Sequence, residues 1–272
     1  MSVSPTIEVR NLRFETDERI PRFWHGERRA VTLFFDNLSI FFPAGERFFI
    51  AAVKAHRDRV KDPRLLAEIK AFVAQEGIHG REHDRYNEML RKEGYPIEAM
   101  EKRVERILRR ATKLLPPRWR LAVTCNLEHF TALMGHFILG DPRLLEGAHP
   151  EMAALWRWHA AEENEHKAVA FDVYLASGGN TFERCALMIP TTLIFWAKVI
   201  EHQARLMHEN GILFSPREWI SLVDFLFFRP GGMFKLFLHY LDYYRPGFHP
   251  WDMDNREELD RWKASYRTAA SS

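Results

Sequence analysis

Glutamate and histidine recur in this chain at a spacing that can hold metal ions. Glu76 and His79 lie three residues apart, and Glu163 and His166 repeat that spacing later in the chain. Residues three apart share one face of an α-helix, so each pair can reach a single ion. His83 follows His79 by four residues and shares the same face.

Two further glutamates precede these pairs. Glu46 lies 30 positions before Glu76, and Glu128 lies 35 positions before Glu163. The chain therefore reads as Glu, Glu-x-x-His, Glu, Glu-x-x-His. A four-helix bundle with a dinuclear centre needs this inventory: one Glu from each of two helices and a Glu-x-x-His from each of the other two.

Glu128 gives the best single argument for a buried site. With histidine counted as neutral, no other charged residue lies between Arg120 and Asp141. Burying an unpaired carboxylate costs several kcal/mol or more, and a divalent cation removes that cost. For an isolated Glu, an arginine partner or a bound proton would be the better interpretation. Three further helices with matching residues favour metal.

The cluster around Glu163 contains other candidates. His159 lies four residues before Glu163, and we expect it to be a seventh ligand. Glu162 or Glu165 could replace Glu163, but the spacing to both His159 and His166 favours Glu163.

Three other histidines are assigned different roles. We expect His83 to hydrogen-bond a ligand carboxylate. His136 lies two turns beyond Glu128, where it could line the pocket beside the metals or be an ordinary core histidine. His129 points about 100° away from Glu128 around the helix, so we do not expect it to reach the metals.

The ligand set predicts both the metals and their chemistry. Two Fe ions are expected, because carboxylates and imidazoles suit Fe or Mn better than a metal that prefers thiolate ligands. Mn and Zn are the alternatives. Glu46, Glu76 and His79 are assigned to one ion and the other four ligands to the second, with Glu76 and Glu163 as bridges. The full predicted set is Glu46, Glu76, His79, Glu128, His159, Glu163 and His166.

We expect such a site to activate O2 and oxidise an organic substrate. Hydrolysis by two metals, which activate water and polarise the substrate, is the alternative. A non-catalytic metal-binding or iron-storage bundle is the second alternative.

Helical patterns account for most of the chain, which predicts an all-α fold. Asp62 and Pro63 are a good helix start, and Gly94 a good stop. The expected helices cover residues 43–59, 62–93, 97–115, 118–139, 150–177, 181–210, 216–228 and 233–244.

Five stretches between residues 40 and 252 resemble a known family. The chain is similar to the ferritin-like di-iron carboxylate superfamily, and especially to the bacterial family labelled predicted metal-dependent hydrolase. The resemblance implies a dinuclear site and leaves the reaction open. His-x-x-x-Glu-x-x-His at 159–166 is also similar to the p-aminobenzoate N-oxygenase type, in which the extra histidine is a seventh ligand and an arylamine is oxidised. The stretches are Phe-Pro-Ala-Gly-Glu-Arg-Phe-Phe (42–49), Gln-Glu-Gly-Ile-His (75–79), Asn-Leu-Glu-His-Phe-Thr-Ala (126–132), Glu-Glu-Asn-Glu-His-Lys (162–167) and Tyr-Arg-Pro-Gly-Phe-His-Pro-Trp (244–251).

The chain is expected to divide into four parts. Residues 1–42 are expected to be an irregular arm, 43–178 a ferritin-like four-helix bundle, 179–251 apolar helices packed on the bundle, and 252–272 a charged tail. We expect the apolar helices to be buried core, a pocket wall or a dimer interface, which suggests a hydrophobic or aromatic substrate and a homodimer. Membrane-surface contact is the alternative.

Composition limits the partners. Among 272 residues, Lys and Arg total 39 against 37 Asp and Glu, a net charge of +2 that argues against nucleic acid. Two cysteines cannot form a disulfide scaffold, and no signal peptide is expected, so a cytoplasmic location is predicted, peripheral to a membrane as an alternative. The basic segment 102–120 is interpreted as a solvated face, with docking of an electron donor or an anionic lipid as alternatives.

Overall fold

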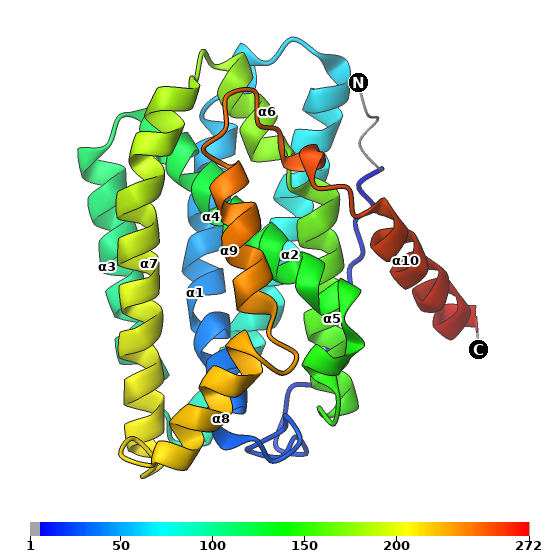
Figure 1. The fold of residues 1–272 in the computed structure, drawn as a ribbon. Helices are drawn as coiled ribbons and strands as arrows, with labels where there is room; N and C mark the ends of the chain where they lie inside the picture. Colours follow the sequence, from blue (N-terminus) through cyan, green and yellow to red (C-terminus); the bar gives the residue numbers. More distant parts are fainter. Residues whose placement is uncertain (1–5, 272) are drawn as a thin grey trace.

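The computed structural model describes residues 6–271, and the predicted all-α fold is confirmed (Figure 1). No strand forms in this range, where His25 and Ala148 make an isolated bridge. The helices are α1 (Arg29–Lys54), α2 (Pro63–Lys92), α3 (Ile97–Leu114), α4 (Pro117–Gly140), α5 (Pro150–His166), α6 (Val169–Ala176), α7 (Thr181–Glu209), α8 (Pro216–Phe227), α9 (Gly232–Asp242) and α10 (Arg256–Ser271).

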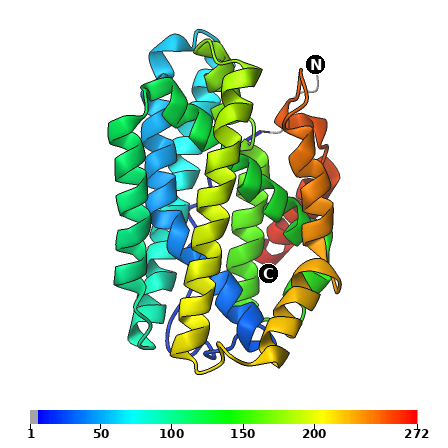
Figure 2. The same cartoon turned by 60° about the vertical axis from the view of Figure 1, so that its left-hand side comes forward.

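Four helices form the centre of the bundle. α1 packs along α2 and α4 along α5, and the two pairs face each other (Figures 1 and 2). α3 and α7 pack beside α1, and α7 also contacts α4. α9 lies against α4, α8 against α1, and α10 against α4 and α5. Every helix that carries a predicted ligand therefore belongs to the central four.

The start of α2 shows how local sequence defines a helix. Pro63 occupies the first helical position, and the side chain of Asp62 accepts a hydrogen bond from the backbone N–H of Arg64 at 2.9 Å. Gly94 follows the helix with φ of +90°, a conformation that favours glycine. These features match the predicted limits to within a residue.

The expected irregular arm at residues 1–42 is wrong in its second part. α1 begins at Arg29 and runs through Pro43, which we had taken as a helix start. Proline has no N–H, so the Ser39 carbonyl four residues earlier loses its helical partner. The side-chain amide of Asn87 on α2 donates to that carbonyl at 3.3 Å. A contact from another helix therefore compensates for the proline.

The single helix expected over 150–177 is divided in two. α5 ends at His166, and α6 begins at Val169. Between them, the Lys167 side chain turns toward the C-terminal segment and donates to the Met253 carbonyl at 2.7 Å and the Asn255 side-chain oxygen at 2.8 Å. Both partners lie far along the chain, so local sequence could not reveal the break.

Asp36 is a buried acid that does not belong to the predicted ligands. Asp36 on α1 accepts hydrogen bonds from the Trp24 indole at 3.0 Å and the Tyr86 hydroxyl at 2.6 Å. Burial raises its pKa to about 7, although both hydrogen bonds act in the opposite direction.

Of the three roles considered for the apolar C-terminal helices, buried core is wrong for α7. α7 is long and apolar enough to cross a membrane, yet only 22% of its most apolar window is buried. Phe182, Ile189, Leu193 and Ile200 on this helix are all exposed. α7 packs on α1 and α4 along one side and leaves an apolar side uncovered within the described chain.

Candidate metal centre

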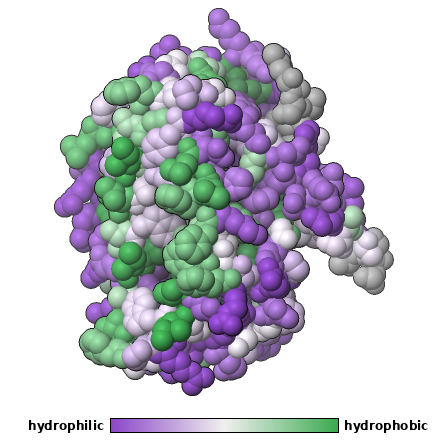
Figure 3. Space-filling view, viewed as in Figure 1, coloured by the Kyte–Doolittle hydropathy of each residue, from purple (hydrophilic) through white to green (hydrophobic). Residues whose placement is uncertain are grey.

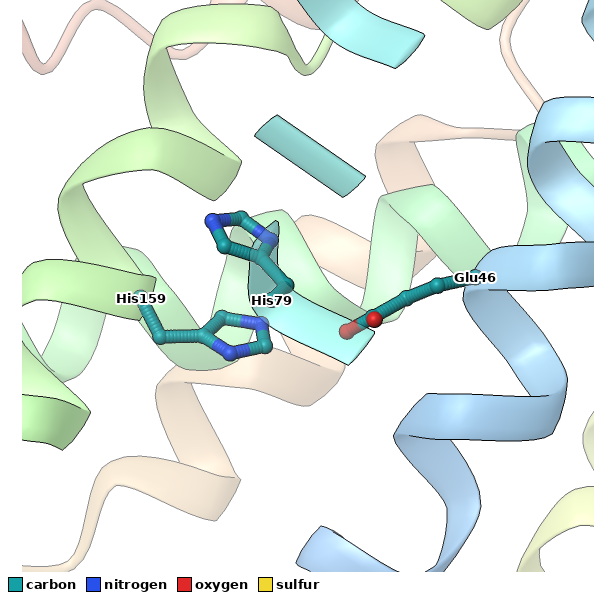
Figure 4. Close-up of side chains that lie close together, drawn as sticks. All are labelled: Glu46, His79 and His159. Carbon is teal, nitrogen blue, oxygen red and sulfur yellow. The ribbon is translucent and has the colours of Figure 1, made fainter. Parts of the chain in front are cut away.

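All seven predicted ligands meet between the four central helices. Glu46 comes from α1, Glu76 and His79 from α2, Glu128 from α4, and the remaining three from α5. None is more than 3% exposed. Figure 4 shows the side chains of Glu46, His79 and His159 directed toward one another from three helices.

The ligand atoms fall into overlapping groups. One comprises Glu46, His79 and His159, and another comprises Glu76, Glu128 and His166; within each group, the atoms lie within 4.8 Å of one another. The expected division between the two ions is therefore wrong for His159, which groups with Glu46 rather than with Glu128. The register of α5 causes this, because His159 lies about two turns before His166 and so reaches the opposite end of the site.

Glu76 and Glu163 connect these two groups. Glu76 also forms a third group with His79 and Glu163. Oε1 of Glu163 lies 3.1 Å from His159 Nε2, 3.3 Å from His79 Nδ1 and 3.6 Å from His166 Nε2. Burial acts to raise the pKa of Glu163, but the surrounding imidazoles outweigh burial and hold it well below its usual value. This central position is the one that a bridging carboxylate needs.

Each histidine uses one ring nitrogen to face the centre and the other to make a hydrogen bond behind it. Nε2 of His79 lies 3.0 Å from Glu162 Oε2, and Nδ1 of His166 lies 3.0 Å from Gln75 Oε1. Such bonds fix the orientation and tautomer of a metal-binding imidazole.

His159 is held in the same way, by another histidine. Its Nδ1 lies 2.7 Å from His83 Nε2, and His83 Nδ1 lies 2.9 Å from the Ser39 hydroxyl, which donates to Asn87 Oδ1 at 2.8 Å. His83 was expected to bond a ligand carboxylate; it bonds a ligand imidazole instead. Asn87 also donates to the Ser39 carbonyl that Pro43 leaves without a helical partner. The same side chain therefore compensates for the proline in α1 and ends the hydrogen-bond chain that orients His159.

Arg10 holds two acids of α5, Glu162 and Glu165, a role not predicted from the sequence. It contacts Glu162 at 3.1 Å and Glu165 at 2.8 Å, and Lys263 of α10 contacts Glu165 at 2.8 Å. The amide of Gln75 also donates to Glu165 at 2.9 Å. Glu162 and Glu165 are therefore structural supports rather than ligands. Glu162, Glu163 and Glu165 occupy three of four consecutive positions. Because several unpaired carboxylates cannot be buried together, this spacing could have indicated that some of them pair with cationic side chains.

The unsatisfied atoms of the centre fit divalent cations. No carboxylate oxygen of Glu46 or Glu128 makes a hydrogen bond among the described residues, and neither does Nε2 of His159 or His166. Burial, followed by repulsion from Glu76 and Glu163, raises the pKa of Glu46 well above its usual value, and that of Glu128 is raised by the same causes. Four carboxylates carry four negative charges, which two divalent cations neutralise. The donor set therefore fits a dinuclear metal centre.

A cavity of 480 Å³ leads from the surface to Glu46 and Glu76, between α1 and α2. Gly77 and Gly80 open its inner wall. A Cβ on Gly80 would lie 2.8 Å from Glu46 Oε2, whereas one on Gly77 would meet nothing within 4 Å. Besides Glu46 and Glu76, the lining of the cavity combines apolar residues, among them Pro43 and Ile50, with five charged residues: Arg47, Arg81, Asp84, Arg85 and Glu88.

Two histidines assigned roles from the sequence, His129 and His136, lie outside the centre. His136 lines a separate 560 Å³ cavity with residues of α9, so of the two roles considered for it, the one beside the metals is wrong. It is two turns from Glu128 but faces α9 instead of α5. His129 packs on the ring of Tyr243 at 4.6 Å, away from the centre, as its helix position predicts.

Comparison with known protein families identifies the family of this chain. A family model described as predicted metal-dependent hydrolase matches residues 8–254. The chain belongs to this family. No curated protein and no solved structure gave a match. The matched residues include every ligand of the candidate centre. They also include Arg10 and Met253, whose carbonyl accepts a hydrogen bond from Lys167.

Proposed function

We propose that this member of the predicted metal-dependent hydrolase family is a dinuclear metal-dependent hydrolase with a ferritin-like centre. Buried carboxylates and imidazoles from four helices, each imidazole oriented by a second hydrogen bond, support the proposal most strongly. Two divalent metals in such a site can activate water and polarise the bond to be cleaved. The family description and this donor set agree on a metal-dependent enzyme.

The protein's own groups would orient the substrate. The charged cavity between α1 and α2 reaches Glu46 and Glu76, and Arg47 at its mouth is held only loosely, at 3.4 Å from Glu105 and 3.9 Å from Asp84. We infer that Arg47 binds an acidic group of the substrate. This replaces the hydrophobic substrate suggested by the C-terminal helices, since those helices do not line this cavity.

Metal analysis combined with substrate turnover tests the proposal. Protein loaded with Zn, Mn or Fe(II) should cleave members of a panel of p-nitrophenyl esters and phosphates, with acidic members favoured. Glu128→Gln should lose this activity, whereas Arg47→Ala should raise KM for acidic substrates and leave that for neutral ones unchanged. Turnover that is equal in loaded and metal-free protein would refute hydrolysis at this centre.

Oxidation of an organic molecule by O2 with two Fe ions is the second candidate. The two Glu-x-x-His motifs and the candidate bridges Glu76 and Glu163 favour it, because this ligand set is used by di-iron bundles. Such a reaction also needs an electron donor. Oxygen consumption by Fe(II)-loaded protein, compared with Glu128→Gln, distinguishes it from hydrolysis, and iron uptake far beyond two ions per chain would instead indicate storage.

A further inference from the structure

One side of α7 is an exposed apolar row that the metal centre does not explain. Phe182 is 85% exposed and Leu193 is 67% exposed. Positions separated by three, four or seven residues lie on one face of a helix, and six exposed apolar residues of α7 follow one another at intervals of three or four. The exposed row comprises Phe182, Ala186, Ile189, Leu193, Ala197 and Ile200.

The row continues onto α8 and α9. Figure 3 shows hydrophobic side chains over the front of the molecule, where α7, α8 and α9 lie in the same view of Figure 1. The rings of Phe228 and Phe234 are 6.0 Å apart and link the end of α8 to α9. We call the α7 row together with the following residues the apolar face: Ile220, Val223, Phe228, Phe234, Phe237, Leu238 and Leu241, all exposed.

A row of cations on α3 borders the apolar face. Arg103, Arg106, Arg110 and Lys113 follow one another at three- and four-residue intervals, so they share one side of α3. Arg103 forms an ion pair with Glu201 of α7, which shows that this side is turned toward α7. The other three are exposed and form no ion pair among the described residues.

The acids next to the apolar face already have partners. Glu183 pairs with Arg118, Glu201 with both Arg103 and Lys198, and Asp224 with Arg229. A second copy meeting this face could cover its apolar side chains, but most acids beside the face already pair with Lys or Arg, and Asp242 lies 3.6 Å from His239, so few acids would be free for the α3 cations. An anionic lipid surface supplies both an apolar interior and negative charge.

We propose that the apolar face docks on an anionic lipid surface, with the α3 row against the head groups. This arrangement is that of an interfacial helix, whose apolar side is buried at the boundary between head groups and acyl chains while basic residues contact anionic lipid. α7 lies in the plane of the interface rather than across the bilayer, because its opposite side packs on α1 and α4 and carries the buried Arg184. The proposal does not depend on the reaction at the metal centre.

Vesicle flotation of the full chain tests this proposal. The protein is mixed with phosphatidylcholine vesicles that contain either no anionic lipid or 30% phosphatidylglycerol, at low and high salt. Binding to the anionic vesicles is expected, with weakening as salt screens the cations. Arg106→Glu combined with Arg110→Glu should weaken binding at least about 25-fold, since loss of each cation costs about a fivefold factor and the added negative charges repel the lipid further. Ile189→Ser combined with Leu193→Ser should weaken it at least about tenfold at both salt concentrations.

Matched controls separate docking from general charge and from misfolding. Lys54→Glu combined with Lys61→Glu changes the charge equally, but at exposed positions outside α3 and the apolar face, and should leave flotation within about twofold of wild type. Metal content and helical circular dichroism should be unchanged in every variant, because the substituted side chains are exposed. The absence of flotation with anionic vesicles would overturn the proposal. So would equal loss in the control, or a dimer that dissociates on Ile189→Ser and Leu193→Ser without vesicle binding.

Discussion

Replacing Glu128 by glutamine tests the centre without creating a cavity. Glu128 is 1% exposed, and neither of its oxygens makes a hydrogen bond among the described residues, so glutamine loses no hydrogen bond there. It does lose the charge and donor strength of a carboxylate that lies 3.5 Å from His166 Nε2 and groups with Glu76. We therefore expect weaker metal binding with little effect on the metal-free fold.

Thermal unfolding with and without metal measures this difference. At a metal concentration about 100 times Kd, binding stabilises the wild-type fold by about 2.7 kcal/mol. That corresponds to a rise in Tm of about 5 to 11 °C for a chain of this size. A 100-fold loss of affinity leaves Glu128→Gln with about 0.4 kcal/mol, or about 1 to 2 °C, at the same concentration. In the presence of a chelator the two proteins should melt within about 2 °C of each other.

His129→Ala is the matched control, because the neighbouring ring packs on Tyr243 rather than facing the centre. Its absolute Tm is expected to fall through lost packing, but the metal-induced rise should equal that of wild type. Equal loss of this rise in both variants would refute the assignment of helix faces, and a wild-type protein with no rise would refute the centre itself.

Three further predictions concern residues around the centre and in the core. His83→Ala should lower metal affinity about 10- to 100-fold without removing a ligand, as measured by competition with a chromophoric chelator, because His159 loses the bond that orients it; unchanged affinity would contradict that role. Asp36 has a pKa raised to about 7, so its contribution to stability is fully present below about pH 4 and is lost as the pH rises through 7. The stability of Asp36→Asn relative to wild type, from urea unfolding, should therefore increase by up to about 4 kcal/mol between pH 4 and pH 8, and a pH-independent difference would refute the shift. Gly77→Leu should slow metal uptake and release at least about tenfold, because the side chain would fill the cavity above Glu46 and Glu76. Gly140→Leu is the control: a side chain there also meets nothing within 4 Å, but it lines the cavity beside His136 and should leave both rates unchanged. Equal rates in the two variants would show that metals enter elsewhere.

The bundle and its inward-facing ligands could be predicted from sequence because both depend on local spacing. Glu76 and His79, or Glu163 and His166, must share a face on any α-helix, and Glu128 stood out as the lone acid of an apolar helix. Helix starts were predictable where a cap and a proline coincide, as at Asp62 and Pro63.

The errors come from contacts between distant segments. Pro43 reads as a helix start, yet Asn87 allows the helix to pass through it. His83 bonds His159 rather than a carboxylate, and Arg10 reaches acids more than 150 positions away, because these pairings depend on how α1, α2 and α5 are placed in space. The apolar composition of α7 suggested a buried helix, but composition cannot show which side of a helix other helices cover.

A crystal structure with anomalous diffraction data collected at the absorption edge of the bound metal would test the central claim most directly. The account predicts two anomalous peaks per chain between α1, α2, α4 and α5, one beside Glu46, His79 and His159 and the other beside Glu128 and His166, with Glu76 and Glu163 between them. No peak there, with His79 and His166 instead paired directly to the carboxylates in metal-loaded protein, would contradict it.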